Sequence, residues 1–415
     1  MNKDSFRISA LGIFIAIIGF VIAYQFVEPS PPQTITIATG SKTGAYFKYG
    51  KRYKEILAKD GIELNIINTQ GSIENIQLLK DGKVDVAFVQ GGVGNGERDP
   101  NLVSLGSVYF EPLWVFVRKN SSIKRLNNLS GQTVAVGAQG SGTWAIAEQL
   151  IAQNKISTDS KYIKHLSSAD SAQALLAGKV EAAFFVTSPT SDLIGKLLKS
   201  KNIRLLSFDR APAYTNQMRY LSAVTLSQGV ISLSRNIPST DKTLLAPAAT
   251  LATKADLHPA LQNLLIQAMS DVHSDGSIFA DPGHFPSTQF VDYPLSADAE
   301  RYLTDGPPFL QRYLPFWGAV LFDRLKVMLV PLLTLMIPLI KIFPPAYRWR
   351  VRSRIYQWYD ILADIERRGK SEATFHLLDE LTALEDEVRA LKVPLSYTDE
   401  VYNLRLHIDL IKRSL

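Results

Sequence analysis

An internal repeat constrains the fold of this chain more than any other feature. Residues 72–88, SIENIQLLKDGKVDVAF, align without a gap with residues 168–184, SADSAQALLAGKVEAAF, and eight positions are identical. Each copy predicts a helix that ends at a glycine and is followed at once by a buried strand. The pattern favours a duplicated α/β unit. Convergence is the alternative, because every such unit needs a glycine after its helix and an apolar strand.

The same order of elements precedes both copies of the repeat. Thr34–Ala38 predicts a strand, and the loop 40–44 leads from it into a helix. Between 96 and 98 residues later, strand 133–136 is followed by loop 137–143 and another helix. We therefore expect two α/β lobes, with a ligand cleft where strand carboxyl ends and helix N-termini meet.

Two segments are expected to connect the lobes. The run Tyr109–Arg118, YFEPLWVFVR, is typical of a strand that crosses from the first lobe into the second. Leu244–Thr253 is the candidate for the return crossing, before a helix from about 258 to 273. The predicted boundaries are 33–315 for the α/β domain, about 33–115 and 245–315 for lobe 1, and about 116–244 for lobe 2.

Two apolar runs predict membrane segments. Residues 8–27 are an uncharged run of 20, the length that a bilayer requires, and they favour an uncleaved anchor over a cleaved signal peptide. Residues 327–340 are too short alone, but snorkelling of the flanking lysines would complete a crossing, with a buried or interfacial helix as the alternative. The basic stretch 341–354 contains no acidic residue, as expected on a cytoplasmic face.

These segments predict a four-part protein in a bacterial inner membrane. Residues 1–32 form an N-terminal anchor, residues 316–344 a second transmembrane helix, and residues 345–415 a helical tail. The charge distribution places the N-terminus and the tail in the cytoplasm and the α/β domain in the periplasm or otherwise outside the cytoplasm.

Apolar residues in the tail recur at spacings of four and three, the pattern of amphipathic helices. The two clearest sets are Leu377, Leu381, Leu384, Val388 and Leu391, and Tyr397, Val401, Leu404, Ile408 and Ile411. Each set is shorter than the three or four heptads of a coiled coil, which favours a compact helical hairpin or bundle. A dimerising module, giving a homo-oligomer through the tail, or a partner-docking module is the alternative.

Composition excludes several classes of protein. The 415 residues include no cysteine, which rules out disulfides, thiolate metal sites and a cysteine nucleophile. The net charge is +6, but residues 33–315 carry 28 basic against 24 acidic side chains, so nucleic acid is not an expected partner. The six histidines are scattered, without an HExxH motif, and no serine lies in a G-x-S-x-G elbow. We therefore expect no catalytic residue, metal site or cofactor.

The loops that precede the helices suit an anionic group, because helix N-termini offer free backbone N–H groups and partial positive charge. Loop 137–143 does not form a phosphate-binding loop, since Thr143 and Trp144 stand where lysine and serine or threonine belong. Trp144 and its equivalent in the first half, Tyr46, are expected to contact the carbon skeleton of a small ligand, unless they pack under their own helices. Four residues at strand ends are further candidates for cleft contacts: Gln90, Gly91, Thr187 and Ser188.

Three sequence motifs resemble those of a known protein family. They are Gly40-Ser41-x-x-Gly44-x-Tyr46-Phe47-x-x-Gly50, Gly71-Ser72-x-x-Asn75 and Gly82-Lys83-Val84-Asp85-Val86-Ala87. In this order they resemble the TAXI family of solute-binding subunits of TRAP transporters, over about residues 34–285. The resemblance implies a two-lobed, periplasmic-binding-protein-like (type II) α/β fold that captures small carboxylates for a membrane permease.

The resemblance also implies the ligand contacts by position. In the first lobe these are Gly40, Ser41, Gly44, Tyr46, Ser72 and Asn75, and in the second lobe Gly140, Ser141, Gly142, Thr143 and Trp144. The chain departs from the family at Phe47, where a second tyrosine is usual, and residues 207–243 match weakly. It also departs in its two membrane segments, because typical members are released into the periplasm.

The first functional hypothesis is a tethered protein that closes its lobes on a dicarboxylate, a 2-oxoacid or an acidic amino acid and delivers it to a TRAP-type permease. The alternative is a membrane sensor, in which lobe closure is relayed through residues 327–340 to the tail. An enzyme is the third class, and it would need Ser41 or Ser141 within reach of a histidine.

Overall fold

The structure is a computed structural model that describes residues 29–156, 161–369, 374–390 and 397–414, together with 14, 15, 17–19, 21, 22, 24 and 25. The chain divides into two units, Ser30–Val320 and a second unit of Met1–Pro29 with Leu321–Leu415. Much of the predicted N-terminal anchor, residues 8–27, lies outside the described residues.

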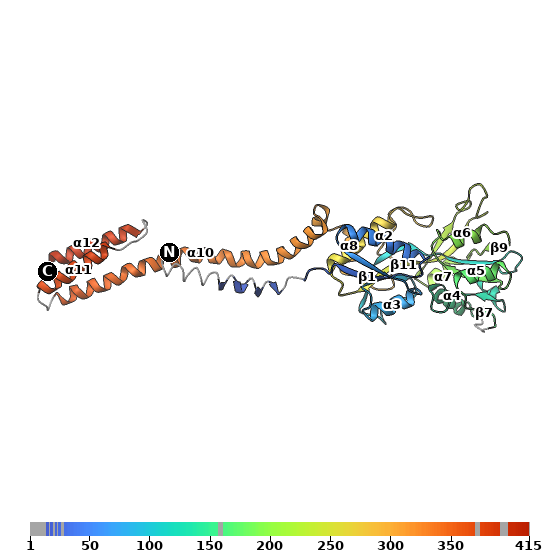
Figure 1. The fold of residues 1–415 in the computed structure, drawn as a ribbon, viewed down its shortest axis with the longest axis horizontal. Coiled ribbons are helices and arrows are strands. Elements are labelled where there is room, and N and C mark those ends of the chain that lie inside the picture. Colours follow the sequence, from blue (N-terminus) through green and yellow to red (C-terminus); the bar gives the residue numbers. More distant parts are fainter. Residues whose placement is uncertain are drawn as a thin grey trace. The chain divides into compact units, whose positions relative to one another are not determined.

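The unit Ser30–Val320 contains two lobes built on mixed sheets of parallel and antiparallel strands (Figure 1). The strands of lobe 1 are β1 (Thr34–Ala38), β2 (Glu63–Ile67), β3 (Val86–Gln90) and β4 (Leu102–Phe110). Those of lobe 2 are β5 (Leu113–Arg118), β6 (Val134–Ala135), β7 (Ile163–Lys164), β8 (Ala182–Val186), β9 (Ile203–Leu205) and β10 (Leu221–Leu226). The strand order runs β2-β1-β3-β11-β5-β8-β6-β7, so the lobes meet at β11 (Lys242–Lys254).

The long strand β11 pairs with strands of both lobes. Its first half, Lys242 to Pro247, pairs antiparallel with β10, and Leu245 also pairs with Leu113 of β5. Its second half pairs antiparallel with β3 and β4. In the other direction the chain passes from β4 to β5 through only two residues, Glu111 and Pro112, and the Glu111 N–H donates to the Pro247 carbonyl of β11. Two adjacent backbone segments therefore connect the lobes, which is the usual form of a hinge.

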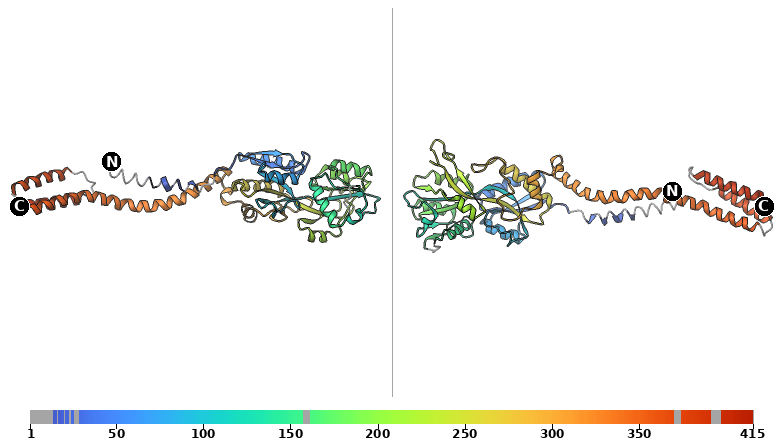
Figure 2. Two further views of the ribbon diagram at one scale, coloured as in Figure 1. Left: turned by 90° about the horizontal axis from the view of Figure 1, so that it is seen from below. Right: turned by 180° about the vertical axis from the view of Figure 1, so that it is seen from behind.

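Helices cover both faces of each sheet (Figures 1 and 2). In lobe 1, α2 (Ala45–Lys59) and α8 (Pro259–His273) contribute to one apolar core, and α3 (Ser72–Lys80) to another. In lobe 2, α5 (Ser168–Leu176) and α6 (Asp192–Leu198) lie against one face of the sheet, and α4 (Gly142–Gln153) and α7 (Ala211–Gln217) against the other. Three shorter elements complete the unit: α9 (Ala297–Asp305) and the 3-10 turns Leu126–Leu129 and Phe309–Arg312. The two-lobed α/β prediction is confirmed.

The predicted repeat has the same secondary structure in both copies. The helices α3 and α5 begin at Ser72 and Ser168, and the strands β3 and β8 begin at Val86 and Ala182, so both pairs are 96 residues apart. Gly82 and Gly178 both have positive φ, of 66° and 71°, as a glycine after a helix requires.

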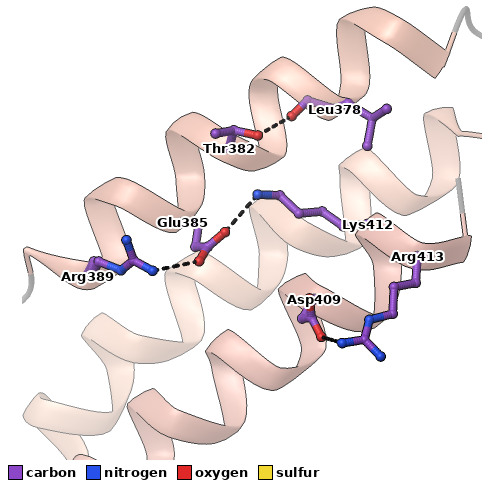
Figure 3. A network of polar contacts seen from close by, with 7 residues as sticks. All are labelled: Leu378, Thr382, Glu385, Arg389, Asp409, Lys412 and Arg413. Atoms are coloured by element: carbon purple, nitrogen blue, oxygen red, sulfur yellow. Dashed lines mark hydrogen bonds and ion pairs between the residues drawn. The ribbon is translucent and has the colours of Figure 1, made fainter.

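The second unit contains α10 (Phe316–Arg368) from Leu321 onward, α11 (Thr374–Arg389) and α12 (Thr398–Ser414). Their apolar faces form a core of their own, with members from each helix: Ile355, Leu362, Ile365, Leu377, Leu381, Leu384, Val388, Tyr397, Leu404 and Ile408. Glu385 of α11 accepts from Lys412 of α12 at 2.7 Å and also pairs with Arg389 (Figure 3). The prediction of a helical tail is confirmed, with Leu391 outside the described residues. One continuous helix occupies residues 316–368, where the sequence predicted a boundary between a membrane segment, 316–344, and the helical tail that begins at residue 345.

Within the described part of the chain, no helix is both long enough and apolar enough to cross a membrane. The two predicted transmembrane segments, 8–27 and 316–344, stay predictions.

Candidate functional site

Four of the predicted site residues form a continuous chain of contacts from lobe 1 to lobe 2. Burial raises the pKa of Tyr46, in the first turn of α2, and the nearby side chain of Ser72, the first residue of α3, opposes the rise. The Ser72 hydroxyl accepts from the Gln90 backbone N–H at 2.9 Å. The Gln90 side chain in turn donates to the Gly142 carbonyl at 3.0 Å, in the first turn of α4. The end of β3 is thereby joined to a helix of the opposite lobe.

Helix N-termini from both lobes meet at this point. The N-cap of α3 is Gly71, and an ideal Cβ on Gly71 would lie 3.9 Å from the Gly142 backbone nitrogen. Gly71 has φ of 132°, a conformation that side-chain-bearing residues rarely adopt. Because α3 and α4 both direct unpaired N–H groups and partial positive charge toward their N-termini, this junction favours a negatively charged group.

A second polar contact between the lobes involves Ser188. Burial raises the pKa of Tyr49, on α2, and the nearby Ser188 side chain of lobe 2 opposes the rise. The hydroxyls of Ser188 and Thr190 lie 2.9 Å apart, and the neighbouring Thr187 carbonyl accepts from the Trp114 indole at 3.0 Å. Ser188 is therefore buried close to Tyr49 of lobe 1, whereas Thr187 is tied by its carbonyl to β5.

Sequence reasoning missed Glu111, which lies between β4 and β5 at the crossing between the lobes. Its carboxylate accepts hydrogen bonds from Tyr46 at 2.7 Å and Tyr109 at 3.0 Å, and the residue is 5% exposed. Burial raises the pKa of Glu111 to about 7, although the two tyrosine hydrogen bonds oppose the rise. A glutamate inside the apolar run YFEPLW was the available signal, because a charged group in such a run must find buried partners.

The tyrosines around Glu111 extend to a buried histidine. Tyr109 stacks on His273 with ring centroids 5.8 Å apart, and His273 Nε2 lies 3.0 Å from the Tyr53 hydroxyl. Burial, with a smaller contribution from Arg52, lowers the pKa of His273 to about 3, so the imidazole is neutral at physiological pH. This cluster is an aromatic and polar floor behind Tyr46.

Asn75, a predicted ligand contact, is fully buried within lobe 1. Its amide donates to the Thr39 carbonyl at 2.6 Å and the Phe88 carbonyl at 2.7 Å and accepts from Thr69 at 2.6 Å. These bonds join the ends of β1 and β3 to the loop before α3. Asn75 thus positions the loops that carry the neighbouring site residues.

The second-lobe loop is organised largely by its own contacts. Ser141 caps α4 by accepting from the Trp144 N–H, and the Thr143 hydroxyl accepts from the Val186 N–H at the end of β8. Trp144 packs against the core of lobe 2. Gly140 has φ of 82° and open space around it. Of this loop, Gly142 makes the contact with lobe 1.

The remaining predicted residues lie at the edge of the site. Ser41 is exposed and its carbonyl accepts from the N–H of Gly44, the N-cap of α2. The Gly91 N–H donates to the Ala248 carbonyl of β11, and a Cβ on Gly91 would lie 2.9 Å from that oxygen. Among the described residues, no hydrogen bond joins Ser41 or Ser141 to a histidine, and no group of three acidic or histidine side chains is placed to hold a metal ion.

A third contact between the lobes was not predicted. Gln149 of α4 donates to the Gly92 carbonyl at 3.0 Å and accepts from the Tyr220 hydroxyl at 2.8 Å. On the lobe 1 side, Asp292 accepts from the N–H groups of Gly92 and Gly94 and so fixes the glycine-rich loop. Burial raises the pKa of Asp292 to about 6, against those backbone hydrogen bonds. The loop 91–96 is therefore a contact between lobes.

The fold places this protein in a structural class. Two α/β lobes with connections at β4–β5 and β11, and with the N-termini of α3 and α4 close together where the lobes meet, form a periplasmic-binding-protein-like fold. Residues 37–275, more than half of the chain, match the NMT1-like family. The chain belongs to the NMT1-like family.

Several solved structures are similar to this chain. The periplasmic aliphatic sulphonate binding protein SsuA from Escherichia coli is 14% identical, covering 67% of this chain and 80% of that chain, with a TM-score of 0.40. An ancestral arginine-binding protein bound to arginine is 17% identical, covering 60% of this chain and 96% of that chain, with a TM-score of 0.40. The GluR0 ligand-binding core from Nostoc punctiforme, in complex with L-glutamate, is 16% identical, covering 59% of this chain and 95% of that chain, with a TM-score of 0.38. None of these likenesses is close enough to transfer a ligand to this chain.

Proposed function

We propose that this protein is a membrane-tethered, extracytoplasmic solute-binding protein that captures a small carboxylate for a TRAP-type transporter. The observation that carries the proposal is the bridge from Gln90 to Gly142, which brings the N-termini of α3 and α4 together from opposite lobes. A carboxylate bound there would receive backbone N–H groups from both lobes, so its binding would favour lobe closure.

The proposed ligand also has to suit the floor of the cleft. Tyr46 and Tyr109 cover the Glu111 carboxyl, which would otherwise repel an anion. With its pKa at about 7, Glu111 is protonated in a large fraction of molecules at neutral pH. The Glu111 carboxyl therefore opposes the binding of an anion less than a fully ionised group would, and the proposed ligands are the three groups expected from the sequence: dicarboxylates, 2-oxoacids and acidic amino acids.

Ligand class is tested by thermal unfolding of the full chain in detergent. Succinate, 2-oxoglutarate and glutamate are compared with glutamine and arginine as ligands of other charge. A ligand at about 100 times its Kd stabilises the folded state by about 2.7 kcal/mol, which gives a clear rise in Tm. A rise with arginine or with an alkanesulphonate, and none with the three carboxylates, would reject the carboxylate class.

The bridge itself is tested by Gly142→Ala. A Cβ at this position would lie 2.3 Å from the Gln90 Oε1 atom, so the Gln90 side chain must leave. We expect Kd for the carboxylate to rise about tenfold, equivalent to about 1.4 kcal/mol. Gly195→Ala in α6 is the matched control, because a Cβ there meets nothing within 4 Å. Equal affinity of both variants would show that the bridge does not contribute to binding.

Tethering and orientation rest on the two apolar runs and the basic stretch 341–354. Because the sequence has no cysteine, single cysteines report position directly. Lys179→Cys in the α/β unit and Ser414→Cys at the end of α12 are both exposed sites. In intact cells an impermeant maleimide should label Lys179→Cys only, and both after permeabilisation. Labelling of both sites in intact cells would overturn the orientation.

A second candidate function, a membrane sensor, is favoured by the helix α10. At its start, Phe316 and Val320 belong to the apolar core of the α/β unit, and the Trp317 indole donates to the Asp60 carbonyl at 2.6 Å. Further along the same helix, Ile355, Leu362 and Ile365 belong to the core of the helical tail. Deletion of residues 346–415 separates the two functions, because solute delivery would survive the deletion and signalling would not.

A further inference from the structure

The two lobes differ strongly in charge. Residues 116–244 contain 16 Lys and Arg side chains and seven Asp and Glu, whereas the rest of residues 33–315 contains 12 basic and 17 acidic side chains. The near balance of the whole domain therefore conceals a basic lobe 2 and an acidic lobe 1. A strong single-sign field attracts partners of the opposite sign.

The basic charge of lobe 2 gathers in a groove of about 1120 Å³. Residues of α6 and β9, the ends of β5 and β11 and the loop 227–241 line the groove. The elements α6 and β9 lie side by side in lobe 2 (Figure 1). Six exposed or half-buried basic residues line it: Lys119, Lys124, Lys199, Lys201, Arg235 and Lys242. Asp209 is the one acidic residue among the lining residues.

The fold itself does not use these six cations. In the part of the chain that the structure describes, none of them has a salt bridge or a side-chain hydrogen bond. Arg204, a seventh basic residue of the groove, differs because its guanidinium donates to the carbonyls of Ser121 and Ile123. Six like charges around one concavity repel one another, so an anionic occupant would relieve that repulsion.

Part of the groove lining is apolar. Phe116, Leu197 and Ile203 are at most 6% exposed, whereas Leu198 and Ile237 are half-buried. The adjoining loop carries Leu233, which at 87% is the most exposed large apolar side chain among the described residues. A phosphate group or a lipid headgroup would leave Leu233 and the exposed parts of Leu198 and Ile237 in water, whereas a peptide with acidic and apolar side chains would cover them together with the charges.

We propose that this basic groove is a docking site for an acidic peptide segment of a partner protein, with alternating or clustered glutamate or aspartate and leucine-type side chains. The site lies on lobe 2 outside the solute cleft, and binding there does not depend on which solute the cleft takes. Charge complementarity would speed the encounter, and apolar contact with Leu233, Leu198 and Ile237 would lengthen the lifetime of the complex.

The test measures binding of a labelled synthetic peptide of glutamate and leucine residues to the full chain in detergent, by fluorescence anisotropy. We expect binding that weakens as salt is raised, and that falls about tenfold in the double variant Lys199→Glu and Lys201→Glu. A peptide in which glutamine replaces glutamate should not bind. Glycerol phosphate, the soluble head group of an anionic lipid, should compete poorly.

The matched control reverses two exposed charges of the same lobe outside the groove, Lys155→Glu and Lys179→Glu. Both double variants have the same net charge, so equal losses would show general attraction to a basic lobe and overturn the proposal. Strong competition by glycerol phosphate would also overturn it, in favour of a membrane surface. The Tm of each variant is compared with that of the parent chain, and a groove variant that melts early is replaced by Lys199→Gln and Lys201→Gln.

Discussion

The two copies of the internal repeat share a backbone but differ in polar content. In lobe 1, Ser72 and Asn75 of α3 are buried and bonded to the ends of β1 and β3. In lobe 2, the equivalent of Ser72, Ser168, is exposed, and the equivalent of Asn75, Ser171, makes one bond, from its hydroxyl to the Leu166 carbonyl. The shared glycine, apolar and lysine positions therefore specify the fold. The polar network of the site depends on the surroundings of the shared serine, which is buried in lobe 1 only, and on the position that differs, Asn75 in lobe 1 and Ser171 in lobe 2.

The largest effect is expected where the copies differ most, at Asn75. Asn75→Ala removes three buried hydrogen bonds and leaves a cavity, so we expect the free energy of unfolding to fall by about 4 kcal/mol. Ser171→Ala, its equivalent in lobe 2, removes one bond and should cost about 1 kcal/mol. Thermal unfolding of both full-length variants gives the comparison.

Asn75→Asp serves as the control for shape. Aspartate has nearly the volume of asparagine and keeps the oxygen that accepts the hydrogen bond from Thr69. It loses the NH₂ group that donates to the Thr39 and Phe88 carbonyls. It should therefore destabilise the protein nearly as much as Asn75→Ala. If Asn75 and Ser171 variants lost equal stability, the polar network of lobe 1 would not distinguish the two copies.

The next largest effect is a pH dependence that originates in lobe 1 at Glu111. Its pKa is raised from 4.5 to about 7 on folding, so the folded state holds its proton more tightly than the unfolded chain. The stability that it contributes is therefore present at low pH and is lost as pH rises from about 4.5 through about 7, by about 3 kcal/mol. Glu111→Gln should abolish this loss, and its stability relative to the parent chain should rise over that pH range.

Two other buried groups titrate in the same range, so the measured quantity is the difference between variant and parent. Asp292, with its pKa raised to about 6, acts in the same direction as Glu111. His273, with its pKa lowered to about 3, acts in the opposite direction, because the unfolded chain takes up a proton below about 6.5. Both cancel in the difference. A difference between Glu111→Gln and the parent that does not vary with pH would refute the raised pKa.

Much of the fold could be predicted because periodic patterns and glycines act locally. The repeat gave the starts of α3 and α5, and the apolar stripes of the tail gave the core residues of α11 and α12. The sequence predicted that Gln90 lies at the end of a strand and Gly142 at the start of a helix, but it did not predict that the two residues meet. The contact itself joins residues 52 positions apart and depends on how the lobes meet.

Roles that depend on tertiary partners could not be predicted from local pattern. Asn75 looked like a ligand contact, but its position behind β1 and β3 gives it three partners within lobe 1. Glu111 was overlooked because its partners, Tyr46 and Tyr109, come from different elements. The basic groove was not predicted because the excess of acidic residues in lobe 1 nearly cancels the excess of basic residues in lobe 2 when the charge of the whole domain is counted.

The smallest effect is expected at the acidic position that the two copies share. Asp85 accepts from the Thr36 backbone N–H at 2.7 Å, so Asp85→Ala leaves a partly buried donor unpaired and should cost about 1.5 kcal/mol. Glu181 instead forms a half-exposed salt bridge with Arg118 at 3.0 Å, and Glu181→Ala should cost about 0.5 kcal/mol. Salt separates the two cases, since the cost at Glu181 should vanish at high ionic strength while the cost at Asp85 persists. Thermal unfolding of both variants at low and high salt measures this, and equal salt dependence would mean that the conserved charge has the same role in both lobes.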